Sequence, residues 1–417
     1  MQTKNTHWPS ILILIVLGTS VLFVFLFIAA TGISSIIDLF SESGDPAGEM
    51  ISTFAFGFEL LVLLVCMWFV FQKAQSREQA DLQFKFPFAN WQILAVLGLM
   101  GLSVMLGAAV IYTEVIALAW VVLPFLTLLV IVPPIWIFFG LGTKGIDFGS
   151  RWRVFSILGL GMTLAPVTMI VLELIILFVI IIAGTVFLAL SQPDLLQEVA
   201  AVGRILQNET DQDVILNLVA PYLSSPAVIA TLIGYIGFIV PLIEELLKPL
   251  GVWLFARKFT SPAQGFAMGM LSGGAFALVE SLNASGNGSA EWVVVVSVRA
   301  GTSLLHMVAS GLVGWGIVSA FQERRYLRLP AAYFCAVAIH GLWNSCAIGM
   351  GISSVGESLG RPEWLAAYAP SMLGGLVVLG VGMFVVLLAA NRKLSSVAVI
   401  SPTPPAETRA ETEEKVK

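Results

Sequence analysis

Charged residues are scarce in this chain. Asp, Glu, Lys and Arg make up only 11% of its 417 residues, whereas hydrophobic residues make up 58%. Soluble globular domains carry roughly a quarter charged residues, and the mean hydropathy here is correspondingly high at +0.94. So few charges cannot cover a water-facing surface, which excludes an ordinary soluble domain. The composition predicts a protein whose surface faces lipid.

Cysteine is also rare. The three cysteines, Cys66, Cys335 and Cys346, lie within apolar runs and form no Cys-x-x-Cys pair. This spacing excludes the disulfide framework of a small secreted protein, and we expect all three to be buried packing residues. The chain also lacks a His-Glu-x-x-His sequence, which excludes the helical zinc motif of many metalloproteases.

Long apolar runs, in contrast, are abundant. A helix needs about 20 apolar residues to cross the bilayer core of roughly 30 Å, and continuous runs are unlike the alternating strands of a membrane barrel. The sequence therefore predicts an all-α, polytopic bundle of about ten transmembrane spans. We expect them at residues 10–31, 51–72, 91–113, 118–142, 155–190, 226–255, 263–282, 292–320, 331–350 and 369–390.

The loops between these spans alternate in charge. Acidic residues gather in the loops around 38–49 and 194–213, whereas every second loop is basic. Because basic loops face the cytoplasm, the pattern predicts that both termini are cytoplasmic and that 155–190 crosses only once despite Pro166. The basic loops contain Lys73, Arg77 and Lys85; Lys144, Arg151 and Arg153; Arg257 and Lys258; Arg324, Arg325 and Arg328; and Arg392 and Lys393.

The same reading divides the chain into five regions. The segment 191–225 has apolar residues at helical period, which predicts short helices on the outer membrane surface. The tail is rich in Pro, Glu and Lys, which is typical of disorder. The regions are a transmembrane region at 1–190, an external amphipathic segment at 191–225, a transmembrane core of four spans at 226–350, a last span within 351–394 and a disordered cytoplasmic tail at 395–417.

Ionisable residues inside the spans concentrate in the second half of the chain. Such residues are costly in a membrane and usually face a bundle interior or a cavity, so they mark candidate functional sites. The first five spans hold only Glu59 and Glu173. Two of the three histidines lie in the second half. The ionisable residues of spans six to nine, with one amide beside them, are Glu244, Glu245, Lys248, Glu280, Arg299, His306, His340 and Asn344.

Span six contains two adjacent carboxylates and a lysine. Lys248 follows Glu244 at i+4 and Glu245 at i+3, so a helix brings its ammonium group within reach of both. A carboxylate held in such an apolar site can act as a general base toward water. From these residues alone, a structural ion pair and the proton site of a carrier stay open as alternatives.

Span seven carries Gly265, Gly269 and Gly273 at four-residue spacing, a stripe that predicts close helix packing. Glu280 ends the same span, either in the site or as a solvated carboxylate at the outer mouth. In span eight, Arg299 lies on the same helical face as His306, and could pair with Glu280 or Glu245.

Span nine places His340 and Asn344 one helical turn apart. An imidazole and an amide can both donate hydrogen bonds, and both are suited to stabilising a developing oxyanion. The polar residues of spans six to nine therefore include a general-base candidate and several hydrogen-bond donors.

At these positions the chain resembles the PrsW group of intramembrane proteases, in the superfamily of the CAAX-prenyl endopeptidases and the bacterial CPBP proteins. The resemblance covers residues 226–350. It rests on Glu-Glu-x-x-Lys at 244–248, Phe-x-x-x-Glu at 276–280, His306, and His340 continuing to Asn344. Two positions depart from the pattern: Glu280 stands where the CAAX enzymes carry histidine, and Ser310, four residues after His306, is not an amide or a carboxylate.

The resemblance implies hydrolysis of a peptide bond within or beside the bilayer, in a membrane protein or membrane-associated peptide. By this analogy Glu244 activates water, and Glu245 and Lys248 position it. The groups that orient the water and stabilise the oxyanion are His306, His340 and Asn344. Glu280 and Arg299, with Lys248, are supporting residues. We expect no nucleic-acid partner, and a location in a prokaryotic plasma membrane.

The resemblance leaves the metal open, because the group has been regarded both as metalloproteases and as glutamate-type hydrolases. Two histidines and a carboxylate can bind zinc, so the candidate ligands for zinc or another divalent metal are His306, His340 and Glu280. They come from separate helices, and we expect no tightly held metal.

Two other functions stay open from the sequence. A transporter could use the same buried charges to carry protons or ions, although no internal repeat relates the two halves and the polar residues cluster in one of them. A catalytically silent member of the protease fold is the other alternative.

Overall fold

The computed structural model describes residues 7–41, 44–209, 211–223, 225–286, 289, 291–358 and 367–399. Within these residues the chain is almost entirely helical, and its one extended pairing is an isolated bridge between Gln83 and Ser150. Ten segments are long and apolar enough to cross a membrane. The predicted all-α bundle of about ten spans is confirmed, and the protein is an integral, multi-pass membrane protein. The orientation of the termini stays a prediction, and residues 400–417 of the predicted disordered tail lie outside the described residues.

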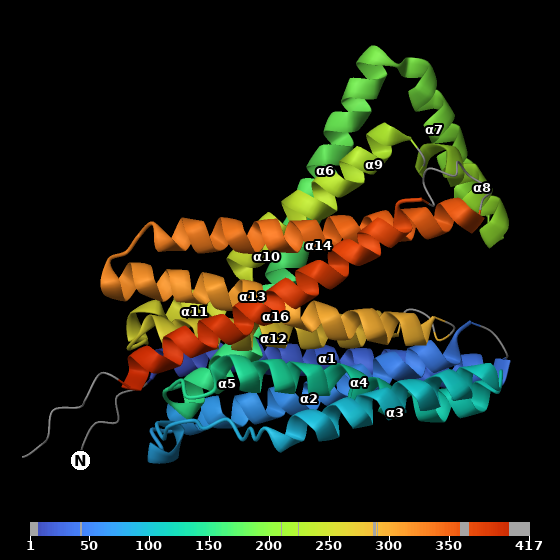
Figure 1. Ribbon diagram of the computed structural model, residues 1–417. Coiled ribbons are helices and arrows are strands. Elements are labelled where there is room, and N and C mark those ends of the chain that lie inside the picture. Colours follow the sequence, from blue (N-terminus) through green and yellow to red (C-terminus); the bar gives the residue numbers. More distant parts are fainter. Residues whose placement is uncertain are drawn as a thin grey trace, which may run out of the picture.

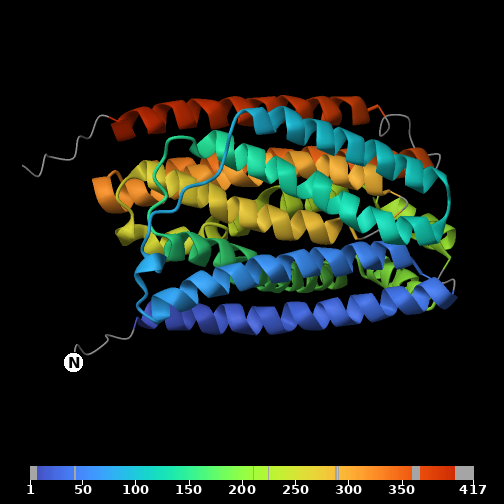
Figure 2. The ribbon, with the colours of Figure 1, turned by 90° about the horizontal axis from the view of Figure 1, so that it is seen from below.

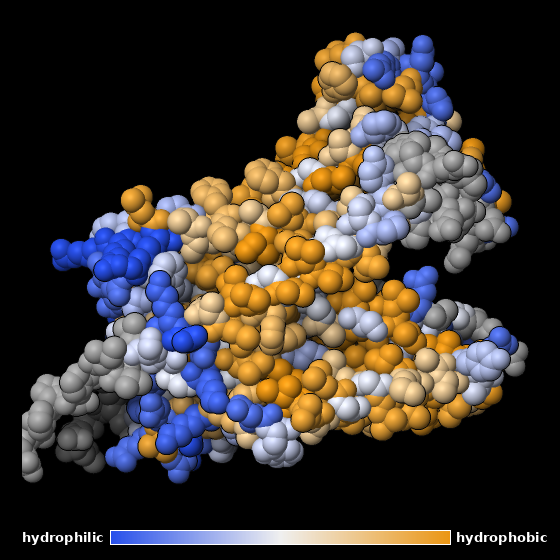
Figure 3. Space-filling view, viewed as in Figure 1, coloured by the Kyte–Doolittle hydropathy of each residue, from blue (hydrophilic) through white to orange (hydrophobic). Residues whose placement is uncertain are grey.

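The first four spans form one side of the bundle (Figures 1 and 2). Helix α1 packs along α2, and α4 packs against both α2 and α3. The surface of the bundle carries a band of apolar side chains between hydrophilic ends (Figure 3), as expected for a surface that faces lipid. These helices are α1 (Trp8–Ser41), α2 (Pro46–Ala74), α3 (Trp91–Tyr112) and α4 (Ile116–Thr143), with the short 3-10 helix η1 (Glu78–Ala80) after α2.

Helices α12 (Pro262–Ala284) and α13 (Trp292–Glu323) lie at the centre and are the most deeply buried spans. The glycine stripe of α12 lets their backbones touch. A Cβ atom on Gly269 would collide with the carbonyl oxygen of Ser310, and one on Gly273 with that of His306. The predicted packing role of the stripe is confirmed, and the contact sets the position of His306.

The fifth span is broken near its start. It consists of α5 (Arg151–Met162) and α6 (Leu164–Ser191), which meet at Thr163. Pro166 explains the break, because it has no N–H to give the carbonyl of Met162 and its ring crowds that group. The two helices together count as one span, as predicted.

Beyond the break, the chain leaves the bundle as an arm (Figure 1). Helix α6 rises away from the other spans, and α7 (Pro193–Leu206) and α8 (Gln212–Leu223) follow it. These two helices occupy the segment for which the sequence predicted short helices. Helix α9 (Pro226–Gly234) returns the chain toward the bundle.

Span six is irregular. After α9 it continues through the π-helical turn η2 (Tyr235–Ile239), then α10 (Val240–Leu247), α11 (Leu250–Phe255) and the 3-10 turn η3 (Ala256–Lys258). Pro249 separates α10 from α11, directly after Lys248. Widened π turns occur often at functional sites, and here one precedes the carboxylate pair.

The last two long helices, α14 (Arg328–Ser358) and α16 (Ala369–Val399), pack against each other and against α13. Cys66 is buried as predicted, but Cys346 is only half-buried and the prediction is wrong for Cys335, which is exposed. Lipid is as apolar as a protein core, so an apolar run does not tell a buried position from one facing lipid.

Candidate active site

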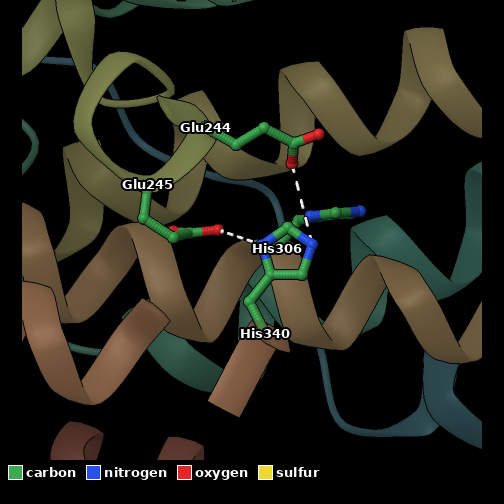
Figure 4. A group of neighbouring side chains, drawn as sticks. All are labelled: Glu244, Glu245, His306 and His340. Carbon is green, nitrogen blue, oxygen red and sulfur yellow. Dashed lines mark hydrogen bonds and ion pairs between the residues drawn. The ribbon is translucent and has the colours of Figure 1, made fainter. Parts of the chain in front are cut away.

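Four side chains of the second half converge inside the bundle (Figure 4). Glu244 and Glu245 come from α10, His306 from α13 and His340 from α14. One potential ligand atom from each lies within 4.8 Å of all the others. Glu245 and His340 are 95 residues apart in the chain, so the cluster depends on how the helices pack.

Lys248 lies at the middle of this cluster and is completely buried. Its Nζ atom is 2.7 Å from Glu244 Oε2 and 2.9 Å from Glu245 Oε1. It also lies 2.7 Å from Nδ1 of His306 and 4.6 Å from the centre of the Phe276 ring. The i+3 and i+4 spacing therefore places Lys248 beside both carboxylates, as expected within one helix. His306, from another helix, is its third partner.

The two carboxylates have different surroundings. The side chain of Glu245 is fully buried, and its Oε1 accepts hydrogen bonds from Lys248 and from Nδ1 of His340, at 2.8 Å for the latter. The side chain of Glu244 keeps 11% of its surface accessible, and its Oε2 lies 3.7 Å from Nε2 of His340. Glu244 is therefore the less buried of the two carboxylates, although its Oε2 atom is itself buried.

His306 is held at both ring nitrogens. Because an ammonium group can only donate, Nδ1 accepts from Lys248 and Nε2 carries the proton that it donates to Glu280 Oε2, at 2.8 Å. Glu280 Oε1 pairs in turn with Nη1 of Arg299 at 2.9 Å, one of the two pairings that the spacing allowed. The Glu280 and Arg299 side chains are partly exposed, so this pair lies at the edge of the buried cluster.

Asn344 lies one turn after His340, but its amide points to the backbone of span six. Its Nδ2 donates to the carbonyl of Ile236, inside the π turn η2, at 3.0 Å. The hydroxyl of Tyr333 donates to the carbonyl of Leu242 in the same way, at 2.7 Å. Carbonyls in or beside an irregular turn need partners in a membrane, and α14 supplies them.

Three contributors were not assigned to the site from the sequence. The Ser272 hydroxyl of α12 donates to the carbonyl of Lys248, where Pro249 interrupts the helix. Tyr333 had no sequence signal, because one tyrosine in an apolar span looks like a packing residue. Glu173 did have a sequence signal, because it is an ionisable residue within a span. Its carboxylate, on α6, is near enough for its charge to interact with that of Glu244.

The chemical types of the four donors, two imidazoles and two carboxylates, are those that bind a divalent metal. Of the ligands predicted from the sequence, the two histidines belong to this set, whereas Glu280 does not and pairs with Arg299. The space between the four donors, however, contains the ammonium group of Lys248. Two like unit charges about 4 Å apart repel each other by about 4 kcal/mol at an effective dielectric constant of about 20. A divalent ion beside the Lys248 ammonium group would double this repulsion. With Lys248 in place, the site does not fit a metal ion.

Fold and site together define an integral membrane protein with an acid–base cluster in its interior. The family model described as PrsW family intramembrane metalloprotease matches residues 150–390, more than half of the chain. The chain belongs to this family and is a membrane-embedded protease. The match is wider than the motif-bearing residues 226–350, since it includes α5, the arm and most of α16. No curated protein and no solved structure matches the chain.

Proposed function

We propose that the protein is an intramembrane endopeptidase in which Glu244 activates water to attack a peptide bond of a membrane protein. The observation that supports this most is the difference between the two adjacent carboxylates. Both carboxylates pair with Lys248, but Glu245 is fully buried and also bonded to His340, whereas the Glu244 side chain keeps 11% of its surface accessible. A general base must reach the water it deprotonates, so Glu244 is the base and Glu245 a positioning residue.

The position of the attacking water follows from a distance. Glu244 Oε2 and His340 Nε2 are 3.7 Å apart, too far for a direct hydrogen bond, and Oε2 is itself buried against Lys248. In the proposed reaction a small rotation of the Glu244 side chain opens Oε2, and one water molecule then bonds to both atoms at ordinary lengths. Glu244 takes a proton from this water as its oxygen attacks the carbonyl carbon. The proton then passes to the leaving nitrogen as the peptide bond breaks.

The charges of the site suggest what stabilises the oxyanion. Three carboxylates, Glu244, Glu245 and Glu280, face two cations, Lys248 and Arg299, which leaves one net negative charge. His340 Nδ1 donates to Glu245, which orients the ring so that Nε2 lies beside Glu244. A ring carrying both protons would present Nε2–H there as a donor for the oxyanion.

The remaining assigned residues have supporting roles in this proposal. Both nitrogens of His306 are engaged, which supports a role in holding Lys248 rather than contacting substrate. One N–H of Asn344 holds η2, and its second N–H is the group that could still reach an oxyanion. Lys248 supplies the positive charge at the place a metal would occupy, so the proposed reaction uses no metal although the family is described as metalloproteases.

Two wider assignments belong to the same proposal. The Glu-Glu-x-x-Lys and histidine motifs support placing the chain in the superfamily of the CAAX-prenyl endopeptidases and CPBP proteins. The ten apolar spans support a location in a prokaryotic plasma membrane, with single-span membrane proteins or membrane-associated peptides as substrates.

Reconstitution tests the proposed function. Purified protein in liposomes would be mixed with a library of single-span membrane substrates, and the products identified by mass spectrometry. We expect cleavage by the wild type, none by Glu244→Gln, and normal cleavage by Glu59→Gln. Glu59 is a matched control because it is also a buried membrane carboxylate, hydrogen-bonded to Asn283 at 3.0 Å. Proton-coupled uptake without cleavage, lost in Glu244→Gln, would instead indicate a carrier.

A further inference from the structure

A second polar feature lies far from the proposed catalytic groups, at the end of the bundle that carries the basic loops. A cavity of about 860 Å³ opens between the start of α1, the end of α2, the start of α5 and the end of span six. Figures 1 and 2 place these helix ends together at the same end of the bundle. Its volume is within the range of about 300–1,000 Å³ that is usual for small-molecule sites.

The rim of the cavity is basic. Lys73, Arg153 and Lys258 line it, together with one carboxylate, Asp81. Lys73 is paired with Asp81 at 2.7 Å, so the lining keeps the two positive charges of Arg153 and Lys258. Asp147, outside the lining, also attracts Arg153. Burial lowers the pKa of His7 at the rim; Lys73 and Lys258 lower it further, and Asp81 opposes them.

Arg153 is fixed in place at this rim. Its Nε donates to the hydroxyl of Ser150 at 2.9 Å, and its Nη1 donates to the backbone carbonyl of Lys258 at 2.6 Å. These bonds use two of the five N–H donors of the guanidinium group. The others are available to an anion, and a guanidinium group is well matched to phosphate.

The rest of the lining is apolar or aromatic. Trp8 and Trp152 lie at the level of the basic groups, and the Trp152 ring contacts Phe255, with ring centres 5.5 Å apart. Tryptophan prefers the boundary between membrane and water. Leu12 and Leu254 continue the lining and are themselves exposed at 61% and 60%. The cavity therefore joins a cationic rim at the boundary to an apolar wall along the spans.

We propose that this cavity binds a membrane phospholipid with an anionic, phosphate-bearing headgroup. Arg153 and Lys258 hold the phosphate, the tryptophans lie beside the headgroup and glycerol, and an acyl chain follows Leu12 and Leu254. A free phosphate ion would satisfy the cations but would leave the apolar wall without an occupant. Basic pockets between transmembrane helices on the cytoplasmic side are suited to such lipids, and the basic loops predict that side here.

Native mass spectrometry of the full-length protein in detergent tests this proposal. The protein would be titrated with phosphatidylglycerol, with phosphatidylcholine of the same acyl chains, and with inorganic phosphate. We expect phosphatidylglycerol to bind several-fold more tightly than phosphatidylcholine. Lys258→Gln should weaken phosphatidylglycerol about fivefold, the effect of one basic residue near an anionic surface. Lys393→Gln, an equal charge change on α16 away from the cavity, should have no effect.

Three results would overturn the proposal: equal binding of the two lipids, equal weakening by Lys258→Gln and Lys393→Gln, or displacement of the lipid by inorganic phosphate. A photoreactive phosphatidylglycerol locates the site independently of any substitution. Cross-linking is expected at α1 or α5, and cross-linking confined to other helices would contradict the assignment. Neither measurement depends on protease activity, so failure of the lipid site is distinguishable from failure of the proposed hydrolysis.

Discussion

Replacing Gly273 with alanine tests how the contact between α12 and α13 positions the catalytic groups. The new Cβ would lie well inside the van der Waals distance of the His306 carbonyl oxygen and 2.9 Å from Cβ of Ser310. Both neighbours belong to helix α13, and the oxygen is a backbone atom that cannot rotate away. The two helices must therefore separate locally, and His306 moves with the backbone of α13.

The size of the effect follows from two opposing contributions. Overpacking a close contact costs about 1–3 kcal/mol, and alanine offsets up to about 1 kcal/mol of this because it favours a helix more than glycine does. We expect a net loss of about 1–2 kcal/mol in stability. His306 would also shift relative to Lys248, and a displacement of about 1 Å near a catalytic centre can lower the rate about 100-fold.

Gly274→Ala is the matched control. It lies next to Gly273 on the same helix, but its added Cβ meets only Ile135 and Met307, at 3.4 Å or more. That is an ordinary contact, so this variant should be as stable as the wild type or slightly more stable. The assay is thermal unfolding in detergent together with kcat/KM for a cleaved substrate. If Gly273→Ala and Gly274→Ala behave alike in both measurements, the reasoning is refuted.

Substitutions at three further positions address the site and the core. Lys248→Ala should abolish cleavage and free the space between the four donors. Zinc should then raise the Tm of this variant but not that of the wild type. Stoichiometric zinc in the purified wild type would contradict this prediction. Glu280→Gln keeps an acceptor for His306 and should retain most activity, whereas Glu280→Ala should lose about tenfold or more, measured as kcat/KM; equal losses would exclude the hydrogen bond as the cause. Trp292→Phe removes a buried hydrogen bond of 2.7 Å to Thr127, and should lower stability by about 1 kcal/mol without changing the cleavage rate.

The features that the sequence predicted well depend on local geometry. Lys248 meets both carboxylates because the i+3 and i+4 positions of a helix are neighbours, whatever surrounds that helix. The glycine stripe of α12 predicted close packing for a similar reason, since small residues at four-residue spacing expose the backbone along one face. The number of spans followed from bilayer thickness and apolar length, with the alternation of loop charges deciding that 155–190 crosses once.

The features that could not be predicted depend on how distant helices meet. Spacing could not tell whether Arg299 pairs with Glu280 or Glu245, because that choice is set by how α13 is rotated relative to α12 and α10. Asn344 faces the carbonyl of Ile236, and that carbonyl needs a partner only because η2 is a π turn, which hydropathy does not reveal. The exposed position of Cys335 was missed because an apolar sequence is compatible with both a protein core and a lipid-facing surface.

The central claim is that Glu244 is the general base of a membrane-embedded peptidase. The most direct measurement is the single-turnover cleavage rate of a reconstituted single-span substrate by Glu244→Gln and by the wild type, with both proteins shown to have the same Tm. The account predicts a rate at least about 100-fold lower for Glu244→Gln, the usual contribution of a general base. Cleavage by Glu244→Gln at the wild-type rate would contradict it.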